Sequence, residues 1–175
     1  MKTLAIIFDG NYVLGKIYEY CSKEFKKDEF YTNNTYLHGY NFIIFFFNQV
    51  KLKLREMVSI IKLESNYTDK DCDLKVYITK ASSTSWRHNV NPDYKNLSLG
   101  TDEDMIEIIN MTFKEVVDKY LDDFILCEAF NVESDDTMAL IHRELTNKYQ
   151  DNLISYIFTS SIRANQLQDD KTTIY

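Results

Sequence analysis

The strongest constraint on the fold is the regular alternation of short apolar runs with longer amphipathic segments. Five short runs are predicted as strands, the last as a candidate only: residues 3–8, 74–79, 124–126, 153–158 and 171–175. Between them, apolar residues recur at helical spacing in residues 12–25, 37–63, 101–120 and 134–149. Strands that alternate with helices of this length form βαβ units, in which helices cover both faces of a parallel sheet. The sequence therefore predicts a three-layer α/β domain with a mainly parallel central sheet.

Composition supports a single folded domain over residues 1–175. The chain is 45% hydrophobic and 27% charged, which is typical of a protein that buries a core. Only 4 glycines and 1 proline are available for turns, and this excludes collagen-like, low-complexity and many-stranded β architectures. The length also falls within the range of about 100–200 residues that one domain usually occupies.

Targeting signals and cysteine usage point to the cytoplasm. No run approaches the roughly 20 apolar residues that span a bilayer, and Asp9 interrupts the first apolar run, so neither a membrane segment nor a signal peptide is predicted. The cysteines are Cys21, Cys72 and Cys127, an odd number without the spacing of a zinc site. With a net charge of -7, the chain could bind nucleic acid only through a local basic patch.

The long helical segment at residues 37–63 is apolar on more than one side near its start. Phe42, Phe45 and Phe46 lie partly off its main stripe, so they are either deeply buried or part of a partner surface, and we predict burial. The basic stretch 51–55 is interpreted as a solvated face rather than a phosphate-binding patch. The predicted inward stripe is Tyr40, Ile43, Ile44, Phe47, Val50, Leu54, Val58 and Ile61.

Acidic residues follow two of the predicted strands. Asp9 ends the first strand, and Glu133, Asp135 and Asp136 come after the third. Ligands of parallel α/β sheets bind beyond the carboxyl ends of the strands, and carboxylates that converge there are costly unless a cation neutralises them. Mg²⁺ or Mn²⁺ would suit such ligands, and paired metals drive phosphodiester hydrolysis. Taken alone, however, residues 133–136 are more typical of an ordinary helix N-terminus, with a cap followed by acids in the first turn.

Four segments together resemble the 5′-nuclease family, which comprises flap endonucleases, bacterial 5′-3′ exonucleases and phage ribonuclease H enzymes. They are IFDGNY at 7–12, SWR at 85–87 with PDYK at 92–95, VESDDTMA at 132–139 and TSSIRANQL at 159–167. Their order and spacing cover nearly the whole chain, and the phage enzymes are the most similar. The resemblance implies a PIN-like nuclease domain that uses Mg²⁺ or Mn²⁺.

The resemblance also implies roles for individual residues. Asp9, Glu133, Asp135 and Asp136 occupy positions of metal ligands, and Lys95 matches a lysine near the scissile phosphate. Trp86 and Arg87 are, with Lys95, candidate nucleic-acid contacts, although burial is the prediction for the Trp86 ring over base stacking. His38, His88 and His142 have no metal-binding spacing, and His142 is predicted to be a hydrogen-bonded packing residue.

The three departures at the family's metal-binding aspartates all remove negative charge. Lys80, Ser161 and Arg163 stand where the family has metal-binding aspartates, and Ser98 stands where it has a basic residue. The family's C-terminal helix–three-turn–helix region is expected to be absent from residues 1–175. We expect Lys80 and Arg163 to point into the acidic cluster and to neutralise it internally, in place of metal.

Two functions follow from this pattern. The first is a catalytically degenerate pseudonuclease that needs no cofactor. It would bind a protein partner, or DNA or RNA, in a phage or viral replication or transcription assembly in the host-cell cytoplasm, without contact with a membrane. The alternative is an active Mg²⁺- or Mn²⁺-dependent 5′-3′ exonuclease, flap endonuclease or ribonuclease H that removes 5′ ends of DNA or RNA primers. It would use Asp9, Glu133, Asp135 and Asp136 as ligands and Lys95 on the phosphate.

Overall fold

Within the described residues, five parallel strands form one sheet in the order β3-β2-β1-β4-β5. The computed structural model describes residues 1–27, 39–68, 72–82, 84–91 and 103–175. The predicted α/β class and parallel sheet are confirmed, and the candidate fifth strand is present at the sheet edge. The strands are β1 (Lys2–Asp9), β2 (Cys72–Lys80), β3 (Phe124–Glu128), β4 (Leu153–Phe158) and β5 (Thr172–Ile174).

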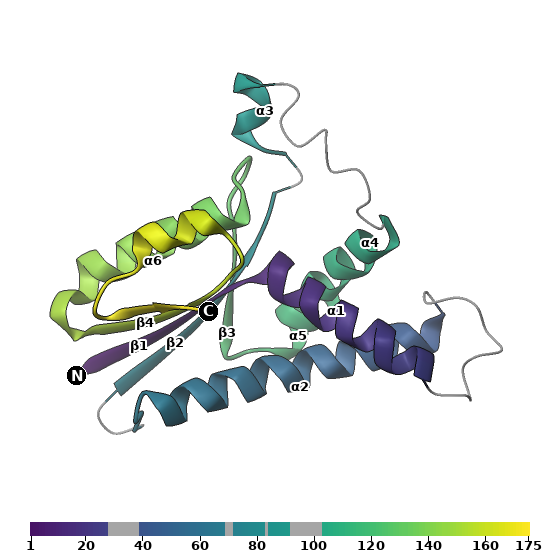
Figure 1. Ribbon diagram of the computed structural model, residues 1–175, viewed down its shortest axis with the longest axis horizontal. Coiled ribbons are helices and arrows are strands. Elements are labelled where there is room, and N and C mark those ends of the chain that lie inside the picture. The colour runs from purple at the N-terminus through teal and green to yellow at the C-terminus, as the bar shows by residue number, and fades with distance from the viewer. Residues whose placement is uncertain (28–38, 69–71, 83, 92–102) are drawn as a thin grey trace.

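Helices cover both faces of this sheet (Figure 1), as the alternation of strands and helices predicts. The main helices are α1 (Gly10–Lys27), α2 (Tyr40–Glu64), α4 (Glu103–Thr112) and α6 (Ser134–Tyr149). A π-helical turn, η1 (Phe113–Val117), joins α4 to the short helix α5 (Asp118–Tyr120). Two 3-10 turns, η2 (Gln150–Asn152) and η3 (Ile162–Leu167), flank β4. None of the described helices combines the length and the apolar character that crossing a bilayer requires.

The central strand β1 is buried on both of its faces. Leu4, Ile6 and Phe8 pack into the core formed with α1, α2, α4 and η1. Ala5 and Ile7 alternate with them and pack into a second core against α6. Since the neighbours of β1 are β2 and β4, its carboxyl end brings Asp9 to the middle of the sheet edge.

The inward face of α2 differs from the predicted stripe near its start. Phe42 and Phe46 are fully buried, and both rings meet the Tyr18 ring edge-on at centroid distances of 5.4 and 5.6 Å. The predicted burial of these two phenylalanines is confirmed. The prediction for Ile44 is wrong, because this residue is 41% exposed. The buried stripe is a strict four-residue repeat that starts at Phe42 and continues through Val50 and Leu54, so Ile44 faces away.

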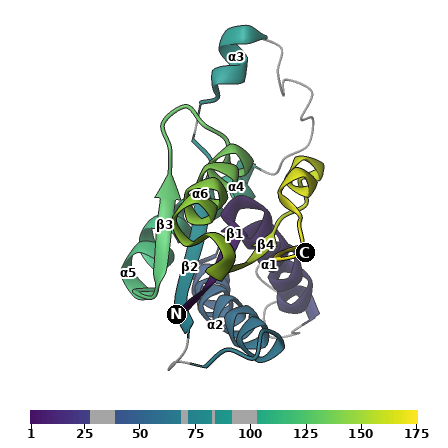
Figure 2. The ribbon, with the colours of Figure 1, turned by 90° about the vertical axis from the view of Figure 1, so that its left-hand side faces the viewer.

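A short helix, α3 (Trp86–Val90), lies outside the helices and strands that the sequence predicts. Ser85 caps it by accepting a hydrogen bond from the Arg87 backbone N–H. The helix stands beyond the carboxyl edge of the sheet, apart from the other helices (Figures 1 and 2). Other predictions lie outside the described residues; they concern Lys95, Ser98, His38, the start of the 101–120 helix, and the side chain of His88.

Candidate functional site

Asp9 is held at the sheet edge by hydroxyl groups. Its Oδ1 accepts a hydrogen bond from Ser134 Oγ at 2.8 Å, and its Oδ2 accepts one from Thr159 Oγ1 at 3.0 Å. Ser134 Oγ also lies 2.5 Å from Thr79 Oγ1, which can donate its proton either to this hydroxyl or to the Phe8 carbonyl oxygen at 3.2 Å. A ladder of hydroxyls from β2, α6 and the end of β4 therefore fixes this carboxylate.

Gly10 allows α1 to start directly after Asp9. A Cβ atom at this position would lie 2.3 Å from the Thr79 carbonyl oxygen and 2.7 Å from the Phe113 ring. These distances are shorter than any real contact, and one of the two groups is backbone, so only glycine fits between β2 and η1. The close approach fixes where the helix begins and so fixes the direction of the Asp9 side chain.

Three more acids lie at the amino-terminal end of α6. Glu133 occupies the N-cap position without a side-chain capping bond, and Asp135 and Asp136 lie in the first turn. Glu133 is only 6% exposed, so its charge cannot be solvated by bulk water and needs a partner. Two arginines, Arg87 and Arg163, contact these three acids. We call the three acids, the two arginines and Asp9 the strand-end cluster.

Arg87 is the first of these arginines. Its guanidinium forms a two-pronged contact with Asp136, from Nη1 to Oδ2 at 2.5 Å and from Nη2 to Oδ1 at 2.8 Å. The same Nη1 lies 3.3 Å from Glu133 Oε2, and the Arg87 side chain is only 15% exposed. Trp86 Nε1 donates to Asp136 Oδ2 as well. These bonds hold the pKa of Asp136 below its usual value, with the Arg87 hydrogen bonds as the largest cause.

Arg163, on η3, is the second arginine. Its Nη2 lies 2.6 Å from Asp135 Oδ2 and 3.5 Å from Glu133 Oε2. Ser161 Oγ donates to the same Asp135 oxygen at 3.2 Å. The expectation that Arg163 points into the acids is confirmed by this geometry, although its side chain remains 49% exposed.

Two other expectations are wrong. Lys80 does not reach the strand-end cluster, because its Nζ pairs with Glu128 Oε2 at 3.0 Å, at the end of the adjacent strand β3. Trp86 is not buried; its ring is 46% exposed and lies against the Arg87 guanidinium at 4.7 Å from the ring centroid. Lys80 lies opposite Glu128 in the register between β2 and β3, and Arg87 rather than Lys80 pairs with Asp136.

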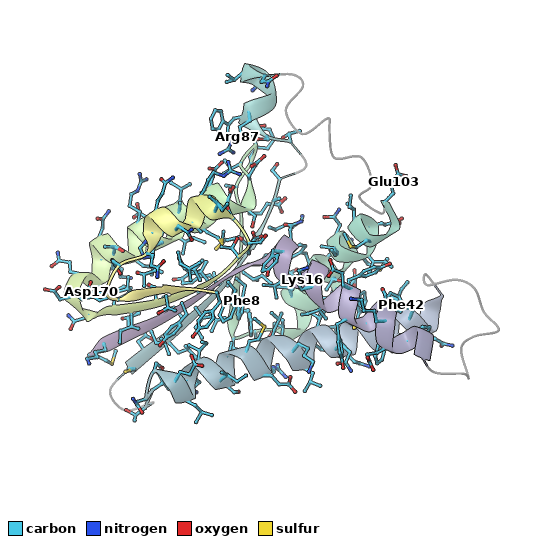
Figure 3. All side chains as sticks on the ribbon, viewed as in Figure 1. Phe8, Lys16, Phe42, Arg87, Glu103 and Asp170 are labelled. Atoms are coloured by element: carbon cyan, nitrogen blue, oxygen red, sulfur yellow. The ribbon has the colours of Figure 1, made fainter. Side chains whose placement is uncertain are left out.

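Sequence reasoning missed the main cation and the supporting hydroxyls. Arg87 was predicted as a nucleic-acid contact, whereas Figure 3 shows it between α3 and the start of α6, where it pairs with acids. Thr79, Ser134 and Thr159 were not singled out. Each of these hydroxyl residues lies at a strand end or next to an acid in the sequence. This is only a weak indication of a site, because hydroxyl residues are common at such positions. His142 fits its prediction, since it is buried and hydrogen-bonded to Thr172 at 3.0 Å.

A divalent metal does not fit the strand-end cluster in this arrangement. Guanidinium nitrogens occupy oxygens of all three acids at the start of α6, and hydroxyl groups occupy both oxygens of Asp9. Among the described residues, no group of three or more His, Cys, Asp or Glu is arranged to hold a metal ion. The charge that a metal would neutralise is met by arginine instead.

Comparisons with known proteins show the fold. No family model and no curated protein sequence matches the chain. Among solved structures, the chain is similar to the 5′-exonuclease of bacteriophage T5 with bound divalent zinc, at a TM-score of 0.54 and 15% identity over 99% of this chain and 55% of that one. It is also similar to the flap endonuclease of bacteriophage T5, at a TM-score of 0.56 and 14% identity over 99% of this chain and 54% of that one.

The second of these structures is a pseudo-enzyme–product complex with DNA and metal ions, in which a lysine replaces an aspartate. At these identities the likeness establishes the fold, so the resemblance to 5′-nucleases is confirmed in its architecture. The chain spans about half the length of each of these phage proteins.

Proposed function

We propose that this protein is a catalytically degenerate 5′-nuclease-like protein that acts by binding a protein partner or DNA in a phage or viral nucleic-acid-processing assembly. One observation carries the proposal: two arginines pair with the acids that the resemblance implies as metal ligands. Arg87 and Arg163 neutralise Glu133, Asp135 and Asp136 through contacts that need no ion. Two-metal hydrolysis depends on carboxylates that are free to bind cations, so an occupied set cannot support it.

The substitutions that separate this chain from the family pattern support the same conclusion. Of the three positions at which the resemblance implies aspartate, Arg163 and Ser161 both contact Asp135, while Lys80 pairs with Glu128. Each substitution removes a carboxylate ligand that the resemblance implies. Those at Ser161 and Arg163 also place a hydrogen-bond donor on an oxygen of Asp135. In the phage flap endonuclease that carries lysine in place of aspartate, a product complex with DNA still forms. Loss of catalysis is therefore compatible with a binding role on this fold.

The alternative, an active metal-dependent 5′-nuclease, requires metal ions to displace both guanidinium groups. Breaking the fork between Arg87 and Asp136 costs more free energy than breaking an exposed ion pair such as that of Lys80 and Glu128. The most exposed contact is that of Arg163, so displacement would begin there.

Cleavage of a 5′-flap DNA and of an RNA–DNA hybrid, with enzyme in excess and Mg²⁺ or Mn²⁺ present, tests the proposal. We expect no products from the wild-type protein above those from the Asp136→Ala variant. The Lys148→Ala variant is the control, because Lys148 lies on α6 far from its acidic first turn. Metal-dependent products that Asp136→Ala abolishes and Lys148→Ala retains would establish an active nuclease and overturn the proposal.

A gain-of-binding variant sharpens this test. Lys80→Asp, Ser161→Asp and Arg163→Asp together restore the acids that the family pattern implies. We expect the triple variant to be less stable than the wild type without metal, because several carboxylates then lack a cation, and to recover stability in Mn²⁺. A triple variant with no Mn²⁺ response would contradict the view that these three positions decide metal binding.

A further inference from the structure

A concave, largely apolar site lies outside the strand-end cluster. A pocket of about 460 Å³ opens between α1, α2 and the ends of β4 and β5. Four aromatic side chains line it: Tyr12, Tyr20, Phe158 and Tyr175. We call it the aromatic pocket. None of its lining residues contributes a side chain to the strand-end cluster, so its role is a separate question.

The walls of the aromatic pocket are held by ring stacking. The Phe158 ring is stacked between the rings of Phe8 and Tyr175, at 5.0 Å from each between ring centroids. The Tyr175 hydroxyl also donates a hydrogen bond to Glu64 Oε2 at 2.7 Å, which ties the end of β5 to the end of α2. Walls held in this way are in place before any ligand arrives, and this lowers the cost of binding.

The charges in the lining of the aromatic pocket are already paired. Lys16 projects from α1 (Figure 3), and its Nζ lies 3.0 Å from Glu19 Oε2. Lys53 Nζ, on α2, lies 2.9 Å from Glu56 Oε2. An anionic ligand would therefore meet no unpaired cation in the lining, while a cationic ligand would meet two ammonium groups. The aromatic pocket thus favours neither sign of charge, and an uncharged ligand fits it best.

The size and the polar groups of the aromatic pocket narrow the ligand further. Its volume lies in the range of roughly 300–1,000 Å³ that small-molecule sites occupy. Ring-lined walls favour an aromatic ligand over an aliphatic one of equal size, because edge-to-face and offset-stacked contacts add to the gain from burial. Within the described residues no protein group hydrogen-bonds the hydroxyl of Tyr12 or Tyr20, so these hydroxyls can bond a polar atom of the ligand.

We infer that the aromatic pocket binds an uncharged small molecule that carries one or two aromatic rings and a hydrogen-bonding oxygen or nitrogen. Nucleic acid fits the same site less well, because its phosphates depend on unpaired cations for their affinity. A peptide of several residues exceeds the volume of the aromatic pocket, so a partner protein could place only one side chain in it. The observations therefore favour a free molecule.

The test uses 2-naphthalenemethanol, a neutral two-ring alcohol, with binding to the full chain followed by ligand-observed NMR. Its saturated twin, decahydro-2-naphthalenemethanol, has a similar size and the same hydroxyl but no aromatic ring. We expect the aromatic alcohol to bind about fivefold more tightly than the saturated twin, because only the aromatic rings can make the directional contacts with the walls.

Two charged relatives of the probe test the preference for an uncharged ligand. They are 2-naphthoate, which carries a carboxylate, and 2-naphthylmethylamine, which carries an ammonium group. We expect neither to bind more tightly than the alcohol, since every charge in the lining already has a partner. A neutral peptide, acetyl-Gly-Trp-Gly-amide, is compared with 3-methylindole, which has the same ring system, and we expect the free molecule to bind at least as tightly.

A matched pair of tyrosine variants locates the site. Tyr20→Leu removes an exposed ring of the lining that lies under Lys53, at 5.7 Å from the ring centroid. The control is Tyr120→Leu, because Tyr120 is also exposed and lies under Lys51 at 5.4 Å, but is not part of the lining. We expect Tyr20→Leu to weaken binding of 2-naphthalenemethanol by about fivefold and Tyr120→Leu to leave it unchanged.

Four results would overturn the inference. Absence of binding by 2-naphthalenemethanol, or equal binding by its saturated twin, would remove the proposed ligand class. Equal losses in the two tyrosine variants would place the binding elsewhere. Tighter binding of either charged relative would show that the aromatic pocket selects charge, and tighter binding of the tryptophan peptide would assign it to a partner protein. None of these results depends on metal or cleavage at the strand-end cluster, so this inference and the proposed function can fail independently.

Discussion

The two halves of the sheet edge hold their acids in different ways. On the α6 side, Glu133, Asp135 and Asp136 face guanidinium groups from two separate segments of chain. On the β1 side, Asp9 accepts hydrogen bonds from hydroxyls, and no ion pair to it occurs within the part of the chain that the structure describes. The difference teaches that internal neutralisation is concentrated at the helix terminus, where three acids are crowded, while a single carboxylate in the middle of the sheet needs only neutral donors.

The largest effect that sharpens this comparison is expected from Arg87→Ala. The substitution leaves Asp136 without its fork and deprives the buried Glu133 of one cation. We expect the free energy of unfolding to fall by about 2–4 kcal/mol, measured by urea denaturation. Arg87→Lys should recover only part of this loss, because one ammonium group cannot make both contacts.

The control for that substitution is Arg143→Ala, which removes an exposed arginine from the same helix that carries the acids. It should change the stability by less than about 0.5 kcal/mol. If Arg87→Ala cost no more than Arg143→Ala, the paired acids would not depend on their arginine, and the contrast between the two halves of the edge would fail.

The next effect concerns the β1 side. Gly10→Ala places a Cβ against the Thr79 carbonyl oxygen and the Phe113 ring, so we expect a loss of about 1–3 kcal/mol in thermal or urea unfolding. Gly15→Ala, on the same helix, has no atom within 4 Å of its new Cβ. It should stabilise the protein by up to about 1 kcal/mol. If both variants changed the stability in the same direction, the close approach of Gly10 to Thr79 and Phe113, which directs the Asp9 side chain, would be refuted.

The pH dependence of stability tests the Arg87 fork in another way. The pKa of Asp136 is lowered in the folded protein, chiefly by Arg87. Its contribution is therefore fully present above its ordinary value of 3.8 and is lost as the pH falls through the lower folded value. We expect acidification to lower the free energy of unfolding of the wild type by more than that of Asp136→Asn. Identical stability profiles between pH 2 and about 5 would contradict the account.

The smallest effects separate the two cations, Lys80 and Arg163, that the resemblance implies are substitutes for metal-binding aspartates. Arg163→Ala should cost about 1 kcal/mol, because the side chain is half exposed yet faces Asp135 and Glu133. Lys80→Ala should cost less than about 0.5 kcal/mol, since its partner Glu128 is 43% exposed and lies outside the strand-end cluster. Urea denaturation measures both losses. A larger loss of stability for Lys80→Ala than for Arg163→Ala would contradict the view that Arg163 neutralises the strand-end cluster and Lys80 does not.

The sequence predicted the sheet well, because the period of apolar residues fixes strands and helices locally. It placed Asp9, Glu133, Asp135 and Asp136 at one edge, since parallel strands must end together. It did not predict the partners of Lys80 and Arg87, because a long cationic side chain reaches several acids and only the tertiary arrangement selects one. For Lys80 the selection is the register between β2 and β3, which sets Glu128 beside it. For Arg87 it is the short helix α3, which no periodic signal indicated.

The most direct test of the central claim is the melting temperature in millimolar Mn²⁺, for the wild type and for Asp136→Ala. A ligand present at ten times its dissociation constant would stabilise the fold by about 1.4 kcal/mol. If arginines have replaced the ions, Mn²⁺ leaves the wild-type melting temperature unchanged, and Asp136→Ala lowers it equally with and without metal. A rise in Mn²⁺ that Asp136→Ala removes would show that the acids bind metal after all and would contradict the account.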